Sequence, residues 1–294
     1  MKKIIIKQVM ILTACLLAFS AGAEIMVEDD AGNRLSFSQP VTRIVSLAPH
    51  ATELLFAAGA TNQVVGTVNY SDYPEAAKKI PVIGGYNKID LESIIAMKPE
   101  LVMIWPGGNS SDQLDAVKKL GLKVFVSEPV EFEDVVSSIR NMAMLLGTQQ
   151  QAEKNATDYL QQLAELKKTY RNRSPVNVFY QVWNEPLMTI NKGHLVSRII
   201  ELCGGVNVFS DLPVLAPRVS IEAVMEKDPE VIIAGMTEDR AIWLEQWQRW
   251  TGLQAVKNKH VYPIDAELVI RQTPRVIQGT RKMCEYLDRV RELK

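Results

Sequence analysis

Three aromatic residues follow strand-like segments in the first half of the chain. Tyr70 comes after the apolar run 64–68, Tyr86 follows two glycines, and Trp105 ends the run 101–104. Ligand sites of open α/β sheets lie at the carboxyl ends of the strands. A single ring at such a place often only covers the core, but three of them favour the binding of a flat apolar ligand by ring stacking.

Signatures of covalent catalysis are absent from the sequence. It contains no G-x-S-x-G, no phosphate-binding P-loop, no G-x-G-x-x-G and no H-E-x-x-H. Its three histidines, His50, His194 and His260, form no cluster with cysteines, so we expect neither a zinc site nor a resident cofactor. An enzyme would need a nucleophile or an acid–base pair in its cleft, and no motif supplies one. We therefore expect a binding protein rather than an enzyme.

The segments that position these residues alternate between two types. The strand-like run 43–47 precedes the helical stretch 51–58, and the run 101–104 precedes the helical stretch 113–120. Alternation of this kind indicates an α/β fold, in which parallel strands form a sheet and helices cover its faces.

An internal repeat predicts two similar lobes. Residues 91–104 match residues 221–234, and each copy has a glutamate seven residues before a proline. Each copy reads as one helix, a proline stop and one buried strand. Copies about 130 residues apart indicate two similar Rossmann-like lobes with parallel central sheets rather than a solenoid. Residues 148–171 lack glycine and proline and carry apolar residues at helical spacing, which predicts one long helix between the lobes.

The beginning of the chain is typical of a secretory signal peptide. A basic start is followed by the apolar run 9–19 and by small residues before Glu24, so we expect cleavage after Ala23 and export to the periplasm. The apolar run is shorter than the roughly 20 residues that span a bilayer. The four residues ending at Cys15 also resemble a lipoprotein lipobox, but the apolar residues after Cys15 favour soluble export.

Composition limits the partners of the mature chain. Loss of the leader removes three lysines and no acidic residue, which changes the formal net charge from −1 to −4 and argues against nucleic acid as a partner. Two cysteines remain, Cys203 and Cys284, which form a disulfide or stay as buried thiols, and an oxidising compartment favours the disulfide. We therefore divide the chain into a signal peptide (1–23), an N-terminal lobe (24–147), an interlobe helix (148–172) and a C-terminal lobe (173–294).

Several stretches of the mature chain resemble the periplasmic cobalamin (vitamin B12)-binding proteins of bacterial ABC importers, within the helical-backbone, class III solute-binding protein family. They are residues 43–49, 52–54, 70–74, 105–109, 201–205, 219–222 and 271–275. The order of these stretches along the chain is typical of the helical-backbone, class III binding proteins as a whole. The sequences Tyr-Ser-Asp-Tyr-Pro at 70–74 and Trp-x-Gly-Gly-Asn at 105–109 are typical of the corrinoid binders within it.

The resemblance implies that a corrinoid lies in the cleft between the lobes and is handed to an inner-membrane ABC permease dimer with its ATPase. It implies a monomer, and ligand contacts from Tyr70, Tyr86, Trp105, Trp183, Asp265 and Arg271. Two aromatic residues of the family appear here as Met188 and Ala216, a loss for which Trp183 could compensate. Haem or a ferric siderophore in the same transport role therefore stays an alternative, and an enzyme on the same scaffold is a remote one.

The resemblance also implies two exposed glutamates and one disulfide. Glu92 and Glu222 would meet arginines of the two permease subunits, one from each lobe. The alternative is that they are helix-start glutamates favoured by the helix dipole. Cys203 and Cys284 match the cysteines of the family, which implies a disulfide between the helix after Leu195 and the C-terminal helix.

His50 follows Pro49 at a predicted helix start, where the family has asparagine. It is either an axial ligand for cobalt or haem iron or a solvent-facing residue at the helix start. We favour the second role.

Overall fold

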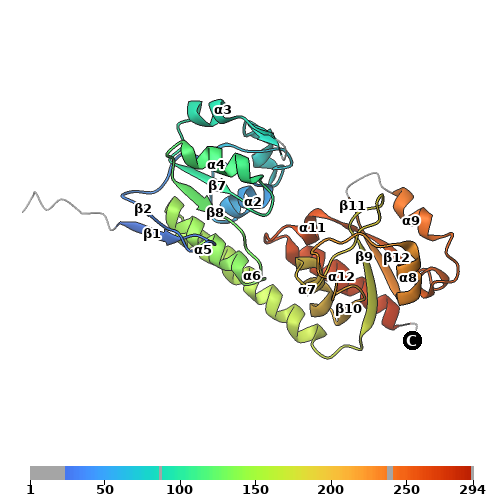
Figure 1. The fold of residues 1–294 in the computed structure, drawn as a ribbon. Helices are drawn as coiled ribbons and strands as arrows, with labels where there is room; N and C mark the ends of the chain where they lie inside the picture. The colour runs from blue at the N-terminus through green and yellow to red at the C-terminus, as the bar shows by residue number, and fades with distance from the viewer. Residues whose placement is uncertain (1–23, 86–87, 237–240, 293–294) are drawn as a thin grey trace, which may run out of the picture.

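The computed structural model describes residues 24–85, 88–236 and 241–292 and consists of two α/β lobes joined by a long helix (Figure 1). The predicted fold class is confirmed. Two of our expectations fall on residues outside the described ranges: the leader with Cys15, and the predicted ligand contact of Tyr86.

The N-terminal lobe is built on a four-stranded parallel sheet in the order β4-β3-β7-β8. Its strands are short and apolar, and both faces of β7 are buried, as is usual where helices cover a parallel sheet. The strands of this sheet are β3 (Ile44–Ser46), β4 (Val64–Gly66), β7 (Leu101–Ile104) and β8 (Val124–Val126). The helices are α2 (Pro49–Ala57), the 3-10 helix η1 (Glu75–Lys79), α3 (Leu91–Ala96), α4 (Ser111–Lys119) and α5 (Asp134–Leu146). Two antiparallel pairs complete the lobe: β1 (Ile25–Glu28) with β2 (Arg34–Phe37), and β5 (Gly84–Gly85) with β6 (Lys88–Ile89).

The C-terminal lobe repeats this plan with a parallel sheet in the order β10-β9-β11-β12. Its strands are β9 (Val176–Gln181), β10 (Gly205–Asn207), β11 (Val231–Met236) and β12 (Val261–Asp265). Its helices are α7 (Leu195–Leu202), α8 (Ile221–Lys227), α9 (Ala241–Trp247), α10 (Gln254–Lys257), α11 (Glu267–Ile270) and α12 (Val276–Arg291).

The internal repeat of the sequence corresponds to equivalent positions in the two lobes. Helix α3 with β7 forms the first copy, and α8 with β11 forms the second. In each sheet the third strand in chain order pairs with the first, and the second strand lies on the other side of the first. The connections therefore reverse direction between the first and third strands, and ligands of open α/β sheets bind beside such a reversal.

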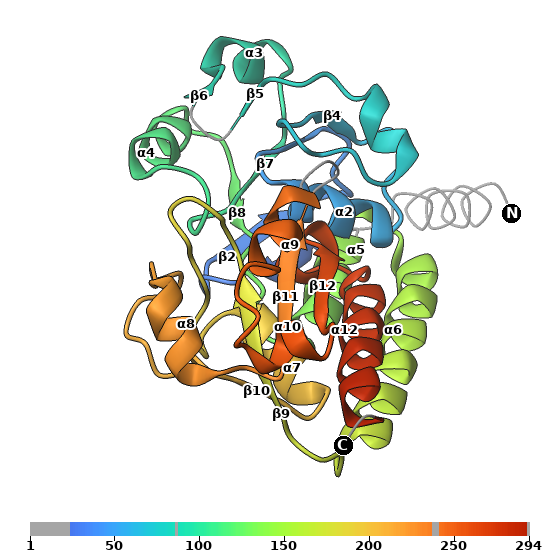
Figure 2. The same ribbon diagram turned by 90° about the vertical axis from the view of Figure 1, so that its right-hand side faces the viewer.

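The helix α6 (Gln149–Tyr170) is the long helix that the sequence predicts between the lobes. Its buried residues fall on one stripe at helical spacing: Ala152, Ala156, Tyr159, Leu163 and Leu166. It packs on α5 in the first lobe and on α12 and α7 in the second, and Figure 2 shows it beside α12. One continuous cluster of buried side chains therefore extends from the first lobe across α6 into the second. Among the described helices, none is long and apolar enough to cross a membrane.

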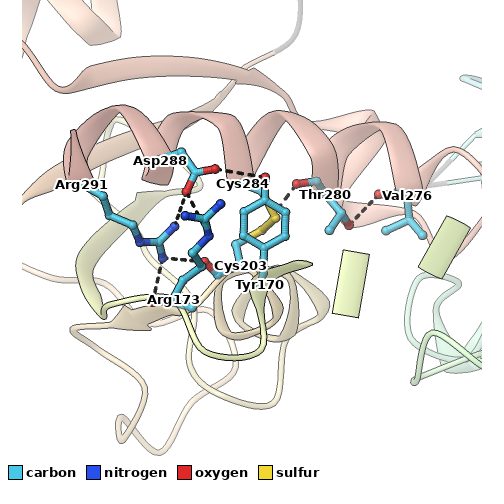
Figure 3. The surroundings of a disulfide bond; sticks show 9 residues. Tyr170, Arg173, Cys203, Val276, Thr280, Cys284, Asp288 and Arg291 are labelled. Atoms are coloured by element: carbon cyan, nitrogen blue, oxygen red, sulfur yellow. Dashed lines mark hydrogen bonds and ion pairs between the residues drawn. A yellow bond between two sulfur atoms is a disulfide. The ribbon is translucent and has the colours of Figure 1, made fainter. Parts of the chain in front are cut away.

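The predicted disulfide between Cys203 and Cys284 is confirmed (Figure 3). It joins the end of α7 to α12, with the two Cα atoms 4.8 Å apart and both residues fully buried. Polar contacts surround it, because Arg291 donates to the carbonyl of Cys203 and to Asp288, and Tyr170 of α6 also donates to Asp288. The C-terminal helix is thereby fastened to α7 covalently and to α6 by hydrogen bonding.

Replacing both cysteines by serine should lower the free energy of unfolding by about 2–5 kcal/mol, because the bond closes a long loop in the unfolded chain. The two cysteines are separated by 81 positions in sequence. Equilibrium denaturation of the mature chain measures the effect. A reductant present throughout the denaturation reaches the bond in the unfolded chain, so it should lower the stability of the wild type towards that of the double variant and leave the variant unchanged. Equal stability of the two proteins under oxidising conditions would contradict the expectation.

Candidate ligand-binding cleft

A cavity of about 710 Å³ lies between the lobes, within the range typical of small-molecule sites. Its N-terminal wall is formed by the segments that follow β3, β4, β7 and β8. Its C-terminal wall comes from the segment after β9, the start of α7, and α11 with the residues that follow it. The carboxyl ends of the strands in both lobes thus converge on one mostly apolar space.

Trp105 lies in the cavity wall on a loop that is held from two sides. The Asn109 side chain accepts a hydrogen bond from the backbone N–H of Trp105 (2.9 Å) and donates one to the carbonyl of Leu47 at the end of β3 (3.0 Å). A Cβ atom on Gly108 would lie 2.0 Å from the Trp105 ring, so only glycine allows the ring to lie against the loop. The Trp-x-Gly-Gly-Asn sequence therefore fixes the position of the Trp105 indole in the cavity wall.

Tyr70 presents a second ring, on a strained turn. Its φ is +66°, a left-handed conformation that is rare for a bulky residue and that occurs preferentially at functional sites. The turn follows β4 and is held by the backbone N–H of Ser71, which donates to the carbonyl of Val68 (3.2 Å). The Tyr70 side chain lines the cavity and is 73% exposed, so most of its surface is open to a ligand.

Arg271 also lines the cavity, and its guanidinium is bound by carboxylates from both lobes. Glu53 of α2, whose side chain is 1% exposed, accepts from Arg271 (2.9 Å) and from Arg275 (2.6 and 2.9 Å). Glu267 pairs with Arg271 at 2.6 Å, and the Arg275 guanidinium stacks on the Tyr73 ring of the N-terminal lobe, 4.1 Å from its centroid. We call Glu53, Arg271 and Arg275 the interlobe clamp. It joins two elements whose residues lie more than two hundred positions apart in sequence.

Burial changes the acid–base properties of the site. It raises the pKa of the Glu267 carboxyl above its usual range, and Arg271 opposes that shift. It lowers the pKa of His50 to about 4, against an opposing effect of the hydrogen bond to Ser127.

The His50 ring lines the cavity, is 4% exposed, and meets the Trp105 ring edge to face at 5.2 Å. Our expectation of a solvent-facing His50 is therefore wrong, because the ring turns inward to reach the end of β8.

The structure brings together Tyr70, Trp105 and Arg271 and places two further predicted residues outside the cavity lining. Trp183 is 42% exposed, donates to the carbonyl of Glu185 and contacts the Trp243 ring edge to face at 5.5 Å. Asp265 is exposed at the end of β12 and accepts from the backbone N–H of Glu267. Ligand contacts from Trp183 and Asp265 stay predictions.

Several cavity residues were not identified from the sequence. They are Glu128, His194 and Arg198, together with Glu53 and Arg275 beside the cavity. Glu53 and Arg275 belong to stretches that carry the family resemblance, which was the one available signal. Their pairing depends on how the two lobes pack together, and a local sequence pattern cannot predict that packing.

Residues 44–268 match the family described as periplasmic binding protein, and the chain belongs to that family. Its members are binding components of transport systems rather than enzymes. The vitamin B12-binding protein of Vibrio cholerae serotype O1 is 36% identical over 250 residues, which cover 84% of this chain and 90% of the relative. The vitamin B12-binding protein of Yersinia pestis (strain Pestoides F) is 32% identical over 255 residues, covering 85% of this chain and 88% of the relative. The resemblance inferred from the motifs is confirmed.

Solved structures agree with this assignment. The periplasmic vitamin B12 binding protein BtuF of Vibrio cholerae superposes with a TM-score of 0.80 at 34% identity, covering 86% of this chain and 98% of that one. The periplasmic heme-binding protein BhuT, solved with two hemes, has a TM-score of 0.75 at 17% identity, covering 86% and 99%. The second likeness concerns the fold alone.

Replacing Glu53 by glutamine should lower the free energy of unfolding by about 3–5 kcal/mol, because it removes the buried carboxylate that two largely buried guanidinium groups share and leaves them only their contacts with Glu267 and Asp72. Denaturant unfolding of the mature chain measures the change. Glu28→Gln is the matched control, since the pair of Glu28 with Arg34 is exposed and its loss should cost less than about 1 kcal/mol. Similar effects of the two substitutions would show that the interlobe clamp contributes no special stability.

Proposed function

We propose that this protein captures a corrinoid such as cobalamin in the interlobe cavity, as a monomer, and delivers it to an inner-membrane ABC permease dimer with its ATPase. The observation that carries the proposal is the cavity itself, which both lobes line and which presents Trp105 and Tyr70 on loops built for them. Rings on a mostly apolar wall suit a broad, flat ligand. The vitamin B12-binding relatives support the same ligand class.

The charges of the cavity favour a corrinoid over an anionic chelate. Among the described residues that line it, the positive charges are Arg198 and Arg271. Arg198 pairs with Glu131 at 2.7 Å, and Arg271 pairs with Glu53 and Glu267. Neither arginine is left to neutralise a haem propionate or the charge of a ferric siderophore. A corrinoid, whose peripheral side chains are mainly neutral amides, requires no such partner.

Export and docking follow the same proposal. Residues 1–23 act as a cleaved leader that sends the chain to the periplasm. Glu92 and Glu222 are exposed at equivalent positions in the first turns of α3 and α8. The helix starts are capped by the side chains of Asp90 and Ser220, so capping does not depend on the two exposed glutamates. We assign both carboxylates to contact with a two-fold permease, although Glu222 also hydrogen-bonds to Ser220.

Isothermal titration of residues 24–294 with cyanocobalamin, haem and a ferric siderophore tests the ligand. We expect tight one-to-one binding of cyanocobalamin, weakened about tenfold or more in Trp105→Ala by the lost stacking surface. Gly108→Ala should weaken binding as well, because its Cβ displaces the Trp105 ring. Gly252→Ala, where a Cβ meets nothing within 4 Å, is the control. Binding of haem or the siderophore without cyanocobalamin would refute the corrinoid assignment.

Replacing both Glu92 and Glu222 by arginine should leave cyanocobalamin affinity unchanged and abolish stimulation of the permease ATPase in reconstituted vesicles. The reason is that like charges would then face the permease arginines. Glu226→Arg, an exposed substitution on α8, is the control and should stimulate normally. Full stimulation by the double variant would remove these glutamates from the docking surface.

A further inference from the structure

Two histidines enter the cavity wall from opposite lobes, and a hydrogen bond fixes the tautomer of each. His50 Nε2 lies 3.1 Å from the backbone carbonyl of Ser127 and 3.2 Å from its hydroxyl. A carbonyl oxygen only accepts, so Nε2 carries the proton. A neutral imidazole has one donor and one acceptor, which makes His50 Nδ1 an acceptor. It has no hydrogen-bond partner among the residues that the structure describes.

His194 has the opposite arrangement. It is the N-cap of α7, and its Nδ1 accepts from the backbone N–H of Val196 at 3.1 Å. A backbone N–H only donates, so Nδ1 is unprotonated, the ring is neutral, and Nε2 carries the proton as a free donor. Burial lowers the pKa of His194 to about 4, in agreement with this assignment. In the described parts of the chain, His194 Nε2 also has no hydrogen-bond partner.

We infer that His50 and His194 form a neutral subsite that recognises carboxamide groups, His50 accepting from an amide N–H and His194 donating to an amide carbonyl. The inference rests on the proposed function. It identifies the carboxamide side chains as the part of the ligand that these two histidines recognise. A primary carboxamide offers both a donor and an acceptor, whereas a carboxylate offers only acceptors. The unprotonated Nδ1 of His50 has nothing to donate to a carboxylate, so the subsite discriminates against it.

The surroundings of the two rings support discrimination by hydrogen bonding rather than by charge. Glu128 lines the same cavity, and a carboxylate on the ligand would meet it with like charge. Arg198 beside His194 on α7 pairs with Glu131, and Arg271 near His50 pairs with Glu53. Selection of an amide over an acid at this site therefore has both an attractive and a repulsive component.

The test compares cyanocobalamin with its monocarboxylic acid derivatives, in each of which one side-chain amide is hydrolysed. Isothermal titration should show that wild type binds at least one of these acids about tenfold more weakly than cyanocobalamin, because a buried polar group loses its partner. His50→Phe keeps the ring volume without the acceptor. His194→Asn keeps a favoured N-cap with a shorter side chain. Each variant should bind cyanocobalamin about tenfold more weakly and should lose most of the discrimination.

Three controls accompany these titrations: a variant of a histidine outside the cavity lining, circular dichroism, and the visible spectrum of bound cyanocobalamin. His260→Gln, which alters a histidine outside the cavity lining, should change neither affinity nor discrimination, and circular dichroism should show that all variants are folded. If both cavity variants keep wild-type affinity and discrimination, the inference is overturned. It is also overturned if the visible spectrum of bound cyanocobalamin shows an axial-ligand change that depends on His50, since the imidazole would then bind cobalt. If wild type fails to bind cyanocobalamin at all, the proposed function falls first and the inference falls with it.

Discussion

The geometry of the cleft depends on one buried carboxylate. Glu53 projects from the first helix of the N-terminal lobe and is bound by two arginines that follow α11 in the other lobe. Moving three charged groups out of water is costly, so the arrangement persists only where each charge finds its partners. The planar guanidinium groups meet the carboxylate in defined directions, which sets the separation of the lobes more narrowly than apolar contact does. Because Arg271 also lines the cavity, this separation bears on the space open to a ligand.

The two lobes share one fold but line the cavity with two different walls. Both sheets have the same strand order, and both present the carboxyl ends of their strands to the cleft. In the first lobe, the loop after β7 carries Trp105 and the turn after β4 carries Tyr70. Among the described residues that line the cavity, the second lobe contributes aliphatic and charged side chains and no tryptophan or tyrosine. The repeated fold therefore positions the two walls, and the loops that follow the strands determine which side chains face the ligand.

Local sequence patterns predicted the elements and the rings but not the contacts between lobes. The repeat gave α3 with β7 and α8 with β11, because periodicity and a proline stop are properties of neighbouring residues. Trp105 and Tyr70 were recognised because both follow strands in this sequence. The pairing of Glu53 with Arg275 joins positions 222 residues apart, and no local rule connects them. His50 was misjudged for the same reason, since its orientation is decided by a carbonyl 77 residues away.

The disulfide that fastens α12 has a consequence for the order of events in the life of the chain. Both sulfur atoms are buried beneath α7 and α12, so an oxidant reaches them only while the C-terminal helix is still undocked. The chain belongs to a family of periplasmic binding proteins, and a reducing cytosol keeps the thiols apart, so a chain still in the cytosol lacks the link that holds its last helix. The bond therefore forms as folding is completed after translocation, and once α12 has docked it shields the sulfurs from reduction. The chain therefore reaches its full stability only after it has left the reducing cytosol.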